Sequence, residues 1–175
     1  MNGKRALAGL ALLGSLTLAM GCSAMGKDTD GIGYEPRTRD SRAVEDEIGT
    51  LSSQVLDMTD TKGQVTKPGP ADGACSDDDT TLRRVRHPWS LYGLSDNALR
   101  KAMDSLADSL PARGWKVVKD GADSSKNKNR EILAVHMATS SQLEVTWMRG
   151  LDGHDPLISV DVYSRCFRTE GSGTA

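Results

Sequence analysis

The three histidines are the first residues to weigh, because imidazole side chains bind metals and transfer protons near neutral pH. His87, His136 and His154 lie far apart in the chain, and no two have the spacing that presents two metal ligands from one element. Asp152 and Asp155, which flank His154, fit an ordinary turn composition. No serine stands in a Gly-x-Ser-x-Gly elbow. We therefore expect no catalytic residues, no metal and no cofactor.

Cys22 closes an apolar run, residues 6–20, that follows the basic pair Lys4 and Arg5. The run is shorter than the roughly 20 residues of a membrane-spanning helix and is typical of a secretion signal. Its end, LAMGC, resembles the bacterial lipobox, although Ala19 stands where Leu, Val or Ile is usual. We predict a signal peptide over residues 1–21 and a lipid on Cys22. The alternative is ordinary cleavage, which would leave Cys22 as a free thiol.

Acylation of Cys22 would leave two cysteines, Cys75 and Cys166, in the mature chain. Outside the cytoplasm two thiols in one small domain usually form a disulfide. Neither cysteine has a second Cys or a His at metal-ligand spacing. The sequence therefore predicts a Cys75–Cys166 disulfide, with a metal pair or a reactive thiol as alternatives.

A basic stretch with aromatic neighbours, RRVRHPWSLY, is the candidate binding surface. Arg84, Arg86, His87 and Trp89 are its candidate residues, because cations beside exposed aromatic rings suit anionic polymers. In a strand Arg84 and Arg86 would share one face and Val85 the opposite one. The alternative is a solvated strand face on which Trp89 fills the core and the acids at 77–79 screen the arginines.

The elements that position these residues follow from hydrophobic periodicity. A helix is expected over residues 42–60, capped by Asp40 or Ser41, and a second after Ser95, where Leu99, Met103, Leu106 and Leu110 share one face. Strands are expected at 64–66, around 89–91, and at 115–120, 131–137, 142–148 and 157–167. The expected fold class is α+β: an antiparallel sheet of four or five strands with both amphipathic helices packed on one face.

The domain organisation follows from where this periodicity begins and ends. Residues 22–39 are polar, contain glycine and lack apolar periodicity, which predicts a flexible tether after the lipidated Cys22. A single α+β domain is expected over residues 40–168, and a disordered tail over 169–175.

The net charge and the aromatic content limit the classes of partner that we expect. Loss of the signal peptide takes the formal charge from −2 to −4, and Phe, Trp and Tyr are scarce. A nucleic-acid partner is therefore not expected. The expected partners are the lipid bilayer, through the N-terminal anchor, and either an anionic envelope polymer or a membrane protein.

A family is suggested by the stretches LAMGC, RRVRHPWSLYG and LPARGWKVVKDG, together with a Cys near each end of the domain. The chain resembles small actinobacterial (Streptomyces-like) lipoproteins, including the LppA-type group of mycobacteria. The resemblance implies an α+β lipoprotein on the outer face of the cell membrane and supplies no catalytic residues. We therefore expect a non-catalytic binding or interaction module at the cell envelope. The alternatives are an accessory subunit of an envelope protein complex and a cell-wall hydrolase.

Overall fold

The computed structural model describes residues 33–66, 68–151 and 153–169. The predicted signal peptide, Cys22, the first part of the predicted tether and residues 170–175 lie outside the described residues. In the part of the chain that is described, no helix is long and apolar enough to cross a membrane.

Within the described ranges two α-helices form, where the apolar periodicity predicts them. Helix α1 spans Ser41–Met58 and is capped by Asp40, whose carboxylate accepts from the Ala43 amide at 2.8 Å. Helix α2 spans Asp96–Ser109 and is capped by the Ser95 hydroxyl in the same way. A short 3-10 helix, η1 (Pro111–Arg113), then ends at Gly114, whose φ of 82° suits glycine.

In the described residues nine strands form one mixed sheet, which is larger than the four or five strands predicted. They are β1 (Thr38–Arg39), β2 (Gln64–Val65), β3 (Ala71–Ala74), β4 (Leu82–Tyr92), β5 (Trp115–Ala122), β6 (Arg130–His136), β7 (Gln142–Met148), β8 (Leu157–Tyr163) and β9 (Phe167–Thr169). Their order is β1-β9-β4-β8-β7-β6-β5, and β2 and β3 also pair with β4. The expectation of a purely antiparallel sheet was wrong, because β1 runs parallel to β9.

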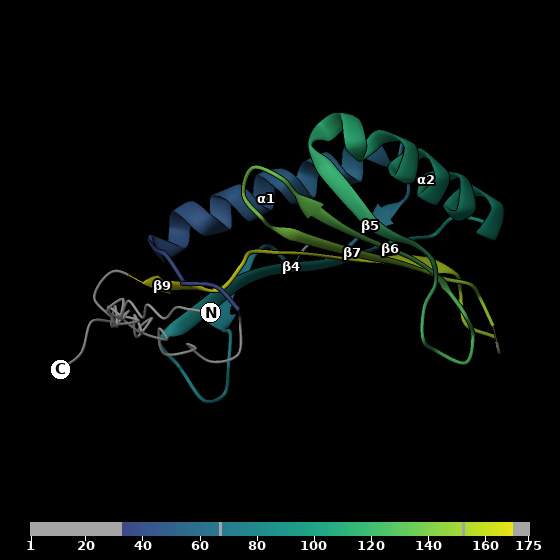
Figure 1. Cartoon of the computed structure of the whole chain (residues 1–175). Helices are drawn as coiled ribbons and strands as arrows, with labels where there is room; N and C mark the ends of the chain where they lie inside the picture. The colour runs from purple at the N-terminus through teal and green to yellow at the C-terminus, as the bar shows by residue number, and fades with distance from the viewer. Residues whose placement is uncertain (1–32, 67, 152, 170–175) are drawn as a thin grey trace, which may run out of the picture.

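Both helices lie on the same side of the sheet (Figure 1). The core is formed between these layers by α1, α2 and one parity of each long strand, as in Val85, Trp89 and Leu91 of β4 and Ile158 and Val160 of β8. The other parity faces away from the helices. The predicted α+β class and the alternation along the strands are therefore confirmed.

The expected tether and tail both contribute residues to the described structure. Strand β1 lies within the expected tether and pairs with β9, which includes Thr169 of the expected tail. The Tyr34 hydroxyl donates to the Cys166 carbonyl at 3.4 Å and accepts from the Cys166 amide at 2.7 Å. Local sequence does not predict these contacts, because each of them joins residues more than a hundred positions apart.

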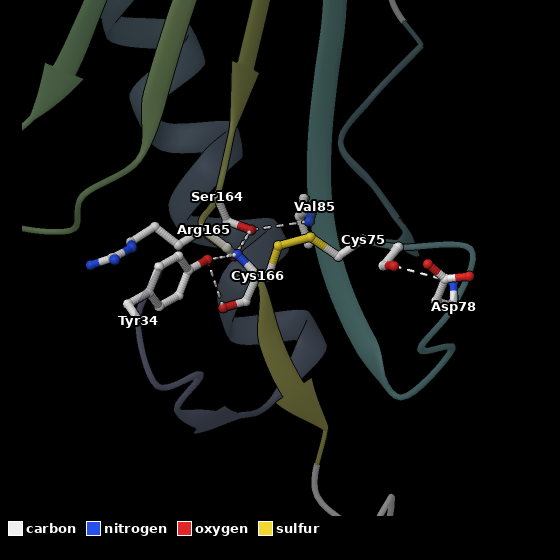
Figure 2. Close-up of a disulfide and its surroundings, with 8 residues drawn as sticks. Tyr34, Cys75, Asp78, Val85, Ser164, Arg165 and Cys166 are labelled. Carbon is white, nitrogen blue, oxygen red and sulfur yellow. Dashed lines mark hydrogen bonds between the residues drawn. A yellow bond between two sulfur atoms is a disulfide. The ribbon is translucent and has the colours of Figure 1, made fainter. Parts of the chain in front are cut away.

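The predicted disulfide is present and joins the loop after β3 to the start of β9 (Figure 2). Cys75 and Cys166 are 91 residues apart in sequence, with Cα atoms 5.8 Å apart. The bond therefore ties the long central strand β4 and its neighbour β3 to the C-terminal strand.

Candidate functional site

The four predicted binding residues lie on β4 but on opposite faces of the sheet. Arg84 and Arg86 face away from the helices, and their guanidinium carbons lie 5.6 Å and 5.8 Å from the centroid of the Tyr163 ring. His87 and Trp89 have the other parity and lie on the helix side, where Trp89 belongs to the core. The four residues therefore do not form one binding surface.

Arg86 is already neutralised by a neighbour on β8. Its guanidinium forms an ion pair with Asp161, to which Nε donates at 2.9 Å. This hydrogen bond raises the pKa of Arg86. Of the acids at 77–79, Asp79 pairs with Arg168. Binding of an anionic polymer by Arg84 and Arg86 stays a prediction.

A groove of about 760 Å³ lies between α1 and the β2–β4 edge of the sheet, and it contains two of the four predicted residues. Its apolar and aromatic lining comprises Leu56, Val65, Trp89 and Tyr92, and its polar side chains are Ser52, Ser53, Gln64, Thr66 and His87. No Asp, Glu, Lys or Arg occurs among the described residues that line it. Most of the lining surface is apolar, and the five polar side chains can form hydrogen bonds but carry no full charge.

The groove lies beside a gap between two short strands that both pair with β4. Strand β3 pairs with residues 83–86 of β4 and β2 with residues 91–92, so neither covers Pro88. The Val85 carbonyl accepts a hydrogen bond from the Ser164 amide, next to β8. The Leu82 and Ser90 carbonyls point to the opposite side, where they accept from the amides that follow β3 and β2. By this alternation the nitrogen of Pro88 faces the gap, where no ladder donor is required. Proline is therefore tolerated inside an eleven-residue strand.

Trp89 is held in the groove wall by a buried hydrogen bond. Its Nε1 donates to the Ser52 hydroxyl of α1 at 2.7 Å, and both residues are almost fully buried. This bond fixes the indole against α1 and defines one side of the groove. Ser52 was not identified from the sequence, although a lone serine beside Leu51 and Val55 on the apolar face of a helix is a signal of such a bond.

His87 places an imidazole at the groove with an unused nitrogen. Its Nδ1 is buried and has no hydrogen-bond partner among the described residues. Burial lowers the pKa of His87, while the charge of Asp161 opposes this effect. The imidazole is therefore neutral at neutral pH, and His87 lines the groove as an uncharged polar residue.

No family model, curated protein or solved structure matches this chain. The resemblance to the LppA-type group therefore stays a prediction, and the site has to be judged by its own chemistry. In the described parts of the chain, no group of three or more His, Cys, Asp or Glu side chains could hold a metal ion. The groove combines an uncharged lining with apolar surface and hydrogen-bonding side chains.

Proposed function

We propose that this protein is a lipid-anchored, extracytoplasmic binding module whose ligand site is the groove beside His87 and Trp89. The groove carries this proposal. Its volume lies within the range of small-molecule sites, about 300–1,000 Å³, and it combines apolar walls with few polar groups, as such sites do. The lipid on Cys22 and the position outside the cytoplasm rest on the N-terminal sequence.

The uncharged lining narrows the ligand class. A charged ligand group in this groove would lose hydration without gaining an ion pair from the described lining residues. An uncharged ligand avoids this cost and gains from contact with Leu56, Val65 and the ring of Tyr92. Gln64, Thr66 and His87 then fix its orientation through hydrogen bonds. We infer a small uncharged molecule, mainly apolar, with one or two hydrogen-bonding groups.

Equilibrium binding of the uncharged fluorophore Nile red to the folded protein tests this assignment. Ser53 lines the groove and is exposed, so Ser53→Glu adds a charge there without burying it in the core. Thr50→Glu adds the same charge on an exposed turn of α1 outside the groove. We expect Ser53→Glu to weaken binding by about tenfold, which corresponds to about 1.4 kcal/mol, and Thr50→Glu to change it little. Equal affinities for both variants and the parent would refute the groove as the site.

A further inference from the structure

The loop of residues 123–129, between β5 and β6, meets the start of the loop that follows β7 at Arg149. The two loops meet near the edge of the sheet opposite β2 and β3. They form a pocket of about 260 Å³, here called the loop pocket, lined by Asp120, Gly121, Lys128, Arg130, Trp147 and Arg149. The register explains why the residues meet: Arg130 pairs with Ala122 on one side and with Trp147 on the other. Three cationic side chains are thereby gathered around a small space, in contrast to the groove.

Side-chain hydrogen bonds hold the loop of residues 123–129 in one conformation. One carboxylate oxygen of Asp123 accepts from the amides of Ser125 and Asn129, both at 3.0 Å, and the Asn129 side chain donates to the other at 3.1 Å. The hydrogen bond from the Ser125 hydroxyl, together with these bonds, lowers the pKa of Asp123. Lys128 is held at a φ of 50°, a conformation that non-glycine residues adopt rarely. The loop therefore presents Lys128 at the pocket without further ordering.

The cations of the loop pocket differ in how far they are already paired. Arg130 forms ion pairs with Asp120 and Asp104, at 2.8 Å and 2.5 Å. Arg149 donates one N–H to the Asn127 carbonyl at 3.0 Å, which joins the two loops. Among the described residues, no carboxylate lies within ion-pair distance of Arg149 or Lys128. Two positive charges therefore border this pocket without an ion-pair partner among the described residues, whereas the lining carboxylate of Asp120 is paired with Arg130.

Trp147 lines the same pocket and carries an unpaired neutral donor. The residue is 9 % exposed, and its Nε1–H is buried without an acceptor among the described residues. An indole nitrogen can only donate a hydrogen bond. The unmatched donor and the two unpaired cations all call for the same complement, an anion with several acceptor oxygens.

We propose that the loop pocket binds a phosphoryl group, either as free phosphate or within a phosphodiester polymer. A tetrahedral phosphoryl group offers oxygens in several directions, which suits a guanidinium and an ammonium approaching from separate loops. The ion pairs of Arg130 position the pocket wall and leave Arg149 and Lys128 as the principal ligands. This site is independent of the groove, which lies at the other edge of the sheet.

The test is a titration of the folded protein with two probes, inorganic phosphate and poly(glycerol phosphate), at low ionic strength. The pocket variant is Lys128→Gln with Arg149→Gln. The matched control, Lys126→Gln with Arg113→Gln, removes the same charge from exposed residues that do not line the pocket. The single variant Lys128→Gln shows whether the loss of binding arises without a folding defect, because the Lys128 side chain makes no hydrogen bond or ion pair among the described residues. The ¹H–¹⁵N signal of the Trp147 indole reports occupancy of the pocket.

We expect saturable binding that shifts the Trp147 signal and weakens about tenfold in the double pocket variant, with a smaller loss in single Lys128→Gln and little loss in the control. Binding of both probes would identify a phosphodiester polymer as an accessible ligand, and binding of phosphate alone would identify the free ion. Equal losses in the pocket and control variants would reduce the effect to general electrostatic attraction and overturn the proposal. An absence of saturable binding for both probes would overturn it as well.

Discussion

At the scale of single residues, the contact between Trp89 and Ser52 is the most consequential hydrogen bond of the groove. Ser52→Ala removes the acceptor and leaves the buried Trp89 Nε1–H unsatisfied, which should cost about 1–3 kcal/mol of unfolding free energy. Ser53→Ala is the matched control, because Ser53 is exposed and its hydroxyl donates only to the Gly49 carbonyl of its own helix. Urea unfolding near neutral pH measures both. A Ser52→Ala variant as stable as Ser53→Ala would contradict the structural role given to this bond.

His87 should make stability depend on pH. Burial lowers its pKa below the ordinary value of 6.5, so folding favours the neutral imidazole. As the pH falls through 6.5, the unfolded state takes up the proton more readily, and the unfolding free energy decreases until the pH is below the folded pKa. We expect the unfolding free energy of His87→Gln to fall less than that of the parent between about pH 7.5 and about pH 5.5. The control is His154→Gln, because His154 is exposed. The same slope in parent and His87→Gln would show that His87 is not responsible.

At the scale of elements, the sequence predicts the long, amphipathic segments and the short strand β2, which is expected at 64–66, but it does not predict β1 or β3. Both helices, their caps at Asp40 and Ser95, and the alternation along β7 and β8 follow from local patterns. Strand β3 does not, because Ala71–Ala74 lies in a stretch rich in Gly and Pro and becomes a strand only by pairing with β4. Strand β1, which has two residues, carries no period at all.

The disulfide acts between elements, and its removal tests that role. Cys75→Ala with Cys166→Ala should lower the unfolding free energy by roughly 2–5 kcal/mol, mainly because the unfolded chain regains the freedom of a long loop. The Tyr34 hydroxyl, which bonds the Cys166 backbone, should retain part of the local order. Chemical unfolding of oxidised protein and the double variant measures the difference. Equal midpoints would mean that the bond adds nothing to stability.

At the scale of the whole molecule, the composition of the binding site could not be predicted from adjacency in sequence. Arg86, His87 and Trp89 are near neighbours in the chain, yet the pleat of β4 sends Arg86 to one face and the other two to the opposite face. The groove is completed by Ser53, which comes from α1, and by residues of β2. These partners depend on how the layers pack, which local sequence does not specify.

Attachment to the membrane is the expectation that links this domain to a cellular location. If Cys22 is acylated, Cys22→Ser should move the protein from the membrane fraction to the soluble fraction, because in our account the lipid at this residue is the attachment. Fractionation of cells followed by immunodetection measures the distribution, and Ser23→Ala serves as a neighbouring control that keeps the cysteine. A Cys22→Ser variant that still sediments with membranes would show another mode of attachment.

The central claim, that the groove beside His87 and Trp89 is a ligand site, can be tested in one ¹H–¹⁵N spectrum. The chain has three tryptophans, and their indole signals report on different places: Trp89 on the groove, Trp147 on the loop pocket and Trp115 on neither. Titration with the uncharged Nile red should shift the Trp89 signal in a saturable way and leave Trp115 and Trp147 unchanged. A saturable shift confined to Trp147 or Trp115, or no shift at any of the three, would contradict the claim.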